Sequence, residues 1–253
     1  MPVWLAAGFW GLVAGSALLV GAAIGYLAAL PQRLIAAIMA FGAGVLISAL
    51  AFDLMDEAYE RGGFDSVSIG FAGGAVLYTA ATWWLNRRGA KHRKRSGHRE
   101  QQPSEEESGG SGIAIAVGSL LDGIPESIVV GVSLIAGGTV SVVTVLAIFL
   151  SNVPEGLSGS AGMKRAGRSA GYIFGLWGGI MIASAVAALA GYAVFRHFSD
   201  EVIAATTAVA AGGILTMLAD TMMPEAFEEA HNLAGLVTVA GFLVAFILTK
   251  LSE

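Results

Sequence analysis

The chain has 253 residues, of which 55% are hydrophobic and 13% are charged, and its formal net charge is −5. This composition excludes an ordinary soluble domain and favours a polytopic membrane protein that has the lipid bilayer as a partner. Cysteine is absent, which excludes disulfides and thiolate metal sites. The modest net charge offers no basis for nucleic-acid binding.

Eight apolar stretches reach the length of about 20 residues that a membrane-spanning helix needs. We therefore predict an all-α protein in which residues 1–253 form a single transmembrane domain. A polar segment, Asn86–Gly112, separates the third stretch from the fourth, and its charged, Gly- and Ser-rich composition predicts disorder. The predicted spans are Val3–Leu30, Leu34–Asp56, Val67–Leu85, Ile113–Ile135, Val140–Met163, Ala170–Phe195, Val202–Met223 and Leu233–Leu251.

Lysine and arginine are distributed unequally between the two ends of these spans. The side of Asn86–Gly112 collects eleven of them and the opposite side only three, Arg61, Arg196 and Lys250. By the positive-inside rule, Asn86–Gly112 is cytoplasmic and both termini lie outside. We therefore expect a multi-pass protein of the cell membrane.

The chain also resembles itself. Residues 44–60 align without gaps on residues 212–228, and both segments end in Met-x-Glu-Ala-aromatic-Glu. The predicted topology places the two segments in opposite directions across the membrane. An inverted repeat of this kind is typical of transporters. We predict that helices 1–3 and 6–8 are the repeats around a central pair, a 3+2+3 arrangement, with Glu57 at the outer mouth and Glu225 at the inner one.

The fourth and fifth stretches carry acids where a membrane helix tolerates them poorly. Asp122 and Glu126 are four residues apart and share one helix face. Ser151, Asn152 and Glu155 form a similar face in the next stretch. A carboxylate at the centre of the bilayer costs about 2.5–3.5 kcal/mol on insertion scales, so these residues indicate function. In an antiparallel hairpin the two faces meet at equal depth.

A proline accompanies each motif. Pro125 and Pro154 each remove one helical hydrogen bond and release the carbonyls of Leu121 and Leu150 as further oxygen ligands. Such an oxygen cluster suits a divalent cation, and oxygen ligands favour Mg²⁺, Ca²⁺ or Mn²⁺ while Zn²⁺ also accepts them. Ion binding should release protons from the carboxylates, so affinity should fall on acidification.

These motifs resemble those of the ZIP (Zrt/Irt-like protein) family of metal transporters. The resemblance covers essentially all eight spans and rests on Asp122-Gly-Ile-Pro-Glu126-Ser, Ser151-Asn152-Val-Pro-Glu155-Gly and Asp220-Thr-Met-Met-Pro-Glu225-Ala. It implies that the transported ion binds between the fourth and fifth helices. The implied metal ligands are Asp122, Glu126, Ser151, Asn152, Glu155 and Asp53, and the implied pathway residues are Glu57, Asp220, Thr221 and Glu225.

The resemblance also implies a function. The chain would move a divalent metal toward the cytoplasm, with zinc as the family default and manganese, iron or cadmium as alternatives. It would not be an enzyme and would bind no prosthetic group. The resemblance is compatible with either a monomer or a homodimer. Asp122 stands where the family commonly has a histidine, which removes a soft ligand. The sixth span has no acid, so we expect one principal ion rather than two.

Two other classes of function compete with transport. Asp122 and Asp220 could serve an intramembrane aspartyl-type hydrolase that shares one proton between two carboxylates. Neither aspartate stands in a Tyr-Asp or Gly-x-Gly-Asp setting, and no His-Glu-x-x-His motif is present. A purely structural scaffold would leave the acids within the spans unexplained.

Overall fold

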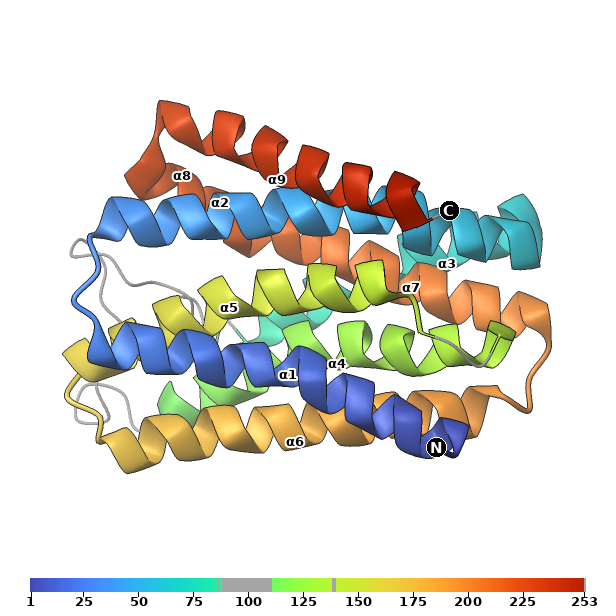
Figure 1. Ribbon diagram of the computed structural model, residues 1–253, viewed down its shortest axis with the longest axis horizontal. Coiled ribbons are helices and arrows are strands. Elements are labelled where there is room, and N and C mark those ends of the chain that lie inside the picture. Colours follow the sequence, from blue (N-terminus) through green and yellow to red (C-terminus); the bar gives the residue numbers. More distant parts are fainter. Residues whose placement is uncertain (86, 88–110, 138–139, 253) are drawn as a thin grey trace.

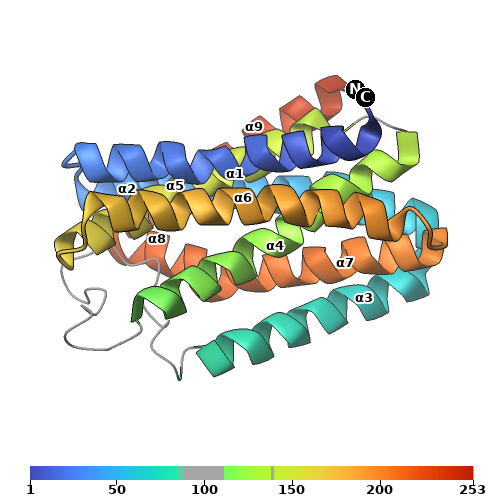
Figure 2. The same cartoon turned by 90° about the horizontal axis from the view of Figure 1, so that it is seen from below.

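The computed structural model describes residues 1–85, 87, 111–137 and 140–252, and every regular element in these ranges is a helix (Figures 1 and 2). The prediction of an all-α protein is therefore confirmed for this part of the chain. The prediction of disorder in Asn86–Gly112 falls almost wholly outside it. The elements are α1 (Val3–Leu27), α2 (Gln32–Ala49), the π-helical η1 (Leu50–Leu54), α3 (Met55–Leu85), α4 (Ser111–Gly137), α5 (Val142–Arg165), α6 (Ala170–Phe195), α7 (Asp200–Met217), the π-helical η3 (Leu218–Met222), α8 (Met223–Ala230) and α9 (Asn232–Ser252).

Local sequence signals set several helix ends. Pro31, which has no N–H to leave unsatisfied, directly precedes α2. Ser141 and Ser169 precede α5 and α6, and each side-chain oxygen accepts a hydrogen bond from the backbone N–H three residues later, at 3.1 and 3.3 Å. Such caps satisfy donors that the first helical turn leaves free. After α5 the chain turns at Gly167, whose φ of 79° suits glycine.

Seven helical segments in the described ranges are long and apolar enough to cross a membrane. Six of them correspond one to one with predicted spans. The seventh, Gln32–Leu85, contains both the second and the third predicted spans. These lengths and compositions are those of a polytopic membrane protein.

The segment Gln32–Leu85 is not one straight rod. A straight helix of its 54 residues would be about 80 Å long, against a hydrocarbon core of about 30 Å. Inside α3, Gly63 has φ 69° and ψ −176°, values that no helix adopts. Beyond Gly63 the chain reverses, and the rest of α3 runs along α7 (Figure 2).

The segment that begins with α7 repeats this local structure. The two aligned sequences each carry a five-residue π-helical segment at the same place, η1 at Leu50–Leu54 and η3 at Leu218–Met222. Extending the alignment pairs Gly63 with His231, which also has a positive φ of 48° and ends α8. α2 and α7 run in opposite directions (Figure 1). The aligned sequences therefore share a conformation that composition alone would not produce.

Small residues let these helices approach closely. A Cβ on Gly74 would lie 1.9 Å from the Val209 carbonyl oxygen in the α3–α7 pair. A Cβ on Gly241 would lie 2.1 Å from the Phe41 carbonyl oxygen in the α2–α9 pair. Neither distance is physically attainable, so only glycine fits. Small residues at interfaces are the usual means of close helix packing in lipid.

The helices pack as two groups, which meet where α2 lies against α5 and α4 against α7. The first group consists of α5, α1, α6 and α4, and each helix in this series packs on the next. In this group, a Cβ on Gly156 would lie 2.1 Å from the Leu18 carbonyl oxygen. A Cβ on Gly131 would lie 1.9 Å from the Ala188 carbonyl oxygen. The second group consists of the pairs α2–α9 and α3–α7 with α8, and η1 touches α7 while η3 touches α2.

α5 is the most enclosed of the long helices. In its most apolar 18-residue window 72% of the residues are buried, against 28% for α6 and 22% for α9. The exposed faces of α6 and α9 carry large apolar side chains such as Ile182, Val186, Leu236 and Leu243. Such surfaces fit contact with lipid. Both termini lie at one end of the bundle (Figure 1).

Candidate metal centre

Three acids lie in the interior of this bundle. Among the acidic side chains that the structure describes, only Asp122, Glu126 and Glu155 are fully buried, with 2%, 2% and 6% of their surface exposed. All three come from the two motifs that the sequence singled out. Because an isolated buried carboxylate is costly, each needs protons, hydrogen-bond donors or a cation nearby.

Asp122 meets a partner that the sequence did not identify. The hydroxyl of Tyr78, on α3, donates a hydrogen bond to Oδ1 of Asp122 on α4. Tyr78 is itself 4% exposed. The signal available in the sequence was a tyrosine within an apolar span, since tyrosine normally gathers at the membrane interfaces. A buried tyrosine hydroxyl usually has a hydrogen-bond partner.

Polar side chains of α5 fix its rotation against α1. The Asn152 amide donates to the Ala14 carbonyl at 3.4 Å, the Ser160 hydroxyl to Ala22 at 3.0 Å, and the Lys164 ammonium to Tyr26 at 2.6 Å. These donors are spaced by multiples of four and therefore share one face of the helix. The Asn152 amide group thus faces α1, and the amide oxygen is the atom through which Asn152 could bind a cation.

Glu155 is three residues after Asn152 on α5, so it lies beside the helix face that contacts α1. Ser151, which precedes it by one turn, donates its hydroxyl to the Ile148 carbonyl of the same helix at 2.9 Å. Because the Ser151 hydroxyl is the donor in this bond, the lone pairs of its oxygen can still bind an ion. Pro154 interrupts the hydrogen bonding of α5, and the Leu150 carbonyl oxygen lies 3.4 Å from the Cβ position of Gly42 on α2. The released carbonyl therefore faces the second helix group.

Asp53 belongs to a different part of the bundle. It lies in η1, and Oδ2 accepts a hydrogen bond from the Thr144 hydroxyl, at 3.5 Å, near the start of α5. Asp220 and Thr221 lie in η3, and the Thr221 hydroxyl donates to the Met217 carbonyl at 2.7 Å. η1 thus contains a predicted metal ligand, and η3 contains two predicted pathway residues. Single π turns inside α-helices are frequent at functional sites.

The two predicted mouth acids have unequal surroundings. Glu57 forms an ion pair with Arg61 at 3.0 Å, one helical turn away. Glu225 lies in the first turn of α8 beside Pro224 and is partly buried. Both acids lie inside longer helices rather than at free helix N-termini, because α3 continues η1 and α8 continues η3. The helix dipole therefore does not explain either acid.

Within the described residues, no three His, Cys, Asp or Glu side chains are grouped closely enough to hold a metal ion. Asp122, Glu126 and Glu155 are all buried but do not form such a group. α4 packs mainly on α6 and α7, whereas α5 packs mainly on α1 and α2. The two acid-bearing helices therefore belong to one group but have different principal neighbours.

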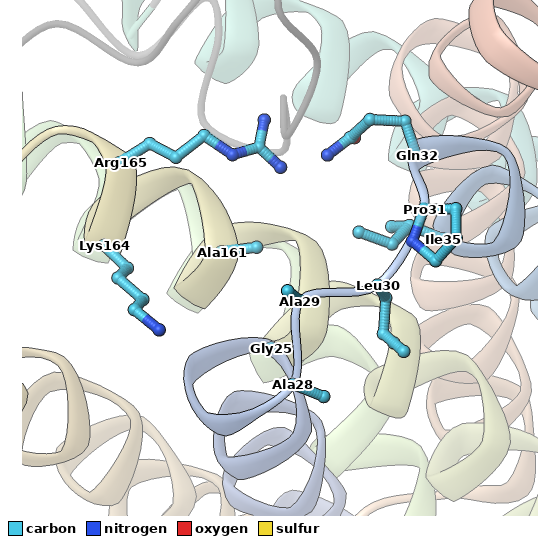
Figure 3. A pocket seen from close by; sticks show the side chains of 10 residues that line it. All are labelled: Gly25, Ala28, Ala29, Leu30, Pro31, Gln32, Ile35, Ala161, Lys164 and Arg165. Carbon is cyan, nitrogen blue, oxygen red and sulfur yellow. The ribbon is translucent and has the colours of Figure 1, made fainter.

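A cavity of about 560 Å³ lies away from these acids, between the α1–α2 link and the last turn of α5. Its charged lining residues are Lys164 and Arg165, and the Arg165 guanidinium and the Gln32 amide point toward each other across it (Figure 3). A positively charged lining repels a divalent cation. We therefore do not assign the ion site to this cavity.

Comparisons with known proteins add no identity. No family model matches the sequence, and no curated protein matches it.

Proposed function

We propose that this protein transports divalent metal cations across the cell membrane toward the cytoplasm, as the resemblance to the ZIP family implies. Zinc is the default cargo, with manganese, iron or cadmium as alternatives. The observation that carries this proposal is the burial of Asp122, Glu126 and Glu155, the only acids enclosed in the described part of the bundle. The proposal includes no enzymatic activity and no prosthetic group.

The charge balance supports a cationic cargo. Asp122, Glu126 and Glu155 together carry −3 when ionised, and a 2+ ion offsets most of this charge. Carboxylate charges in a low-dielectric interior are costly unless they are compensated, and a bound cation provides such compensation. The ligands we propose are Asp122, Glu126, Glu155, Ser151 and the Asn152 amide oxygen, with Asp53 along the path. Since the acids are not yet grouped, the ion itself must draw them together.

We further propose eight spans in a 3+2+3 inverted repeat. The break at Gly63 supports the division of Gln32–Leu85 into two spans. The matching positions of η1 and η3, and of Gly63 and His231, support the repeat. The paired glycine contacts support it further, because the α3–α7 approach at Gly74 has its counterpart in the α2–α9 approach at Gly241. Inverted repeats are characteristic of alternating-access transporters.

The orientation in the membrane follows from the basic residues. Within the described chain, Arg33, Lys164 and Arg168 lie at the end of the bundle opposite the termini, near the ends of α1–α2 and α5–α6. In the sequence, the basic residues of Asn86–Gly112 follow α3 and add to the positive charge that the positive-inside rule assigns to this side. We therefore propose that it is cytoplasmic and that both termini are outside.

Transport requires the buried site to open alternately to either side. The helix packing favours movement between the first and second helix groups, at the α2–α5 and α4–α7 contacts. Movement of α4 and α5 alone against all other helices is less favoured. It would break the close contacts of α4 with α6 and of α5 with α1. Whether two copies associate does not affect this division.

The hydrolase alternative gains no support from the surroundings of its two aspartates. Asp122 is buried and bonded to Tyr78, whereas Asp220 is exposed at the surface of the bundle. Two carboxylates that share a proton need a common environment.

Uptake into reconstituted vesicles tests the transport function. We expect wild type to take up at least one of Zn²⁺, Mn²⁺, Fe²⁺ and Cd²⁺, and Glu155→Ala to lose this uptake because a buried anionic ligand is removed. Glu201→Gln, a change at a surface acid in the first turn of α7, is the matched control and should retain uptake. Absence of uptake of all four ions by wild type would reject the function.

Acidification should weaken ion binding. The carboxylate ligands must lose their protons before they bind the ion, so protons and metal compete for the same oxygens. We expect the dissociation constant, measured by calorimetry on purified protein, to rise steadily as the pH is lowered through the carboxylate range. A pH-independent affinity would contradict carboxylate ligation.

A further inference from the structure

Hydrogen bonds between side chains connect the first helix group to the second. The Tyr78 hydroxyl of α3 donates to Asp122 of α4, and the Thr144 hydroxyl of α5 donates to Asp53 of η1. Each bond ends on a carboxylate that the proposed function assigns to the ion path. The two carboxylates that receive these inter-group hydrogen bonds are therefore also residues of the proposed ion path.

Tyr78 is held firmly on the second group. Its Cβ and Cδ2 atoms lie 3.9 Å from the Cβ position of Gly213 on α7, so the ring packs over a glycine. One turn before it, Gly74 brings α3 against the backbone of α7 at Val209. The ring is thus fixed by α7, while its hydroxyl reaches α4. Leu85 on α3 packs against Leu121, the neighbour of Asp122, and provides a second contact between α3 and α4.

We propose that Tyr78 is the positioning residue for Asp122, and that it completes the ion site from the helix group that does not carry the site. This inference rests on the proposed transport function. A carboxylate has two oxygens and about four lone-pair positions. The Tyr78 hydroxyl occupies one of these positions and thereby holds the carboxylate in one orientation. Hydrogen-bond partners of metal ligands act in this way and typically change metal affinity about 10–100-fold when removed.

The position of Tyr78 on the second group has a mechanical consequence. When α3 moves away from α4, Asp122 loses its hydrogen bond and its fixed orientation. The ion is then bound less tightly. Movement between the groups, which exposes the site, would therefore also lower its affinity and promote release.

The first test is Tyr78→Phe, which keeps the ring and removes only the hydroxyl. Binding of Mn²⁺ and Zn²⁺ to the purified full chain is measured by calorimetry. We expect the dissociation constant to rise about tenfold or more. The melting temperature of the ion-free protein should fall moderately, because the buried Asp122 carboxylate loses a hydrogen-bond donor. Tyr172→Phe, at the start of α6 beside Arg168, is the matched control and should bind like wild type.

A double-mutant cycle separates positioning from packing. If Tyr78 acts through Asp122, Tyr78→Phe should have almost no further effect in an Asp122→Asn background, because interacting residues are not additive. An equal loss in both backgrounds would overturn the inference. Wild-type affinity in Tyr78→Phe would also overturn the inference. If Glu155→Ala still lost uptake in that case, the transport function would stand without the role of Tyr78.

A cross-link tests the mechanical consequence without altering either partner. The chain has no native cysteine, so Leu85→Cys with Leu121→Cys provides a single pair of thiols between α3 and α4. After oxidation by copper–phenanthroline we expect ion affinity to be retained and vesicle uptake to stop, with recovery on reduction. Full uptake by the oxidised protein would show that α3 and α4 need not separate, and would overturn this step.

Discussion

Replacing Glu126 by glutamine is expected to abolish ion binding while leaving the protein folded. Glu126 is 2% exposed and lies one turn from Asp122 on α4. Glutamine has nearly the same shape, so the packing of α4 should be preserved. The amide lacks the negative charge that balances the cation, and we expect affinity to fall by at least about 100-fold, beyond the range typical of outer-shell partners.

Thermal unfolding with and without the ion measures this change. A ligand at 100 times its dissociation constant stabilises the folded state by about 2.7 kcal/mol. Wild type should show this gain, and Glu126→Gln should not at the same ion concentration. Without ion, the two proteins should melt alike. Retained stabilisation of Glu126→Gln by the ion would remove Glu126 from the site and weaken the transport proposal.

The second large effect is expected at Gly74. An alanine Cβ there would lie 1.9 Å from the Val209 carbonyl oxygen, so α3 and α7 would have to separate. Forcing extra atoms into a packed interface typically costs about 1–3 kcal/mol, occasionally more. Both helices belong to the second group, and the displacement would also move Tyr78, one turn further along α3.

The neighbouring glycine supplies the control. A Cβ on Gly73 meets nothing within 4 Å, so Gly73→Ala should be neutral or stabilise the helix by about 0.5–1 kcal/mol. Gly241→Ala, at the corresponding α2–α9 contact with the Phe41 carbonyl oxygen at 2.1 Å, should be destabilising like Gly74→Ala. The melting temperatures of the three variants in detergent test this order. Equal stability of Gly73→Ala and Gly74→Ala would contradict the close α3–α7 approach.

The extent of the helices was largely predictable from the sequence. Bilayer thickness imposes a minimum length on each apolar stretch, and Ala170–Phe195 was predicted with its observed bounds. The exact position of the turn within Gln32–Leu85 was not predictable in the same way. The sequence separates Leu34–Asp56 from Val67–Leu85 by a polar stretch, and only the positive φ of Gly63 shows where in that stretch the chain turns.

The buried acids were also predictable, but their partners were not. Asp122, Glu126 and Glu155 stood out because a charge within an apolar stretch carries a large free-energy cost that needs a reason. That cost is a property of each residue and its neighbours in the chain. Tyr78 is separated from Asp122 by 44 residues, and nothing in the sequence around either residue indicates that they meet.

By itself, the sequence determined which side chains must be enclosed, because hydrophobic length and the cost of burying charge act locally along the chain. Only the tertiary structure decided which groups enclose them. Glycine contacts set the helix neighbours. Those neighbours direct the Tyr78 hydroxyl to Asp122 and turn the Asn152 amide toward α1. Such choices depend on packing between distant segments, which no local pattern of residues specifies.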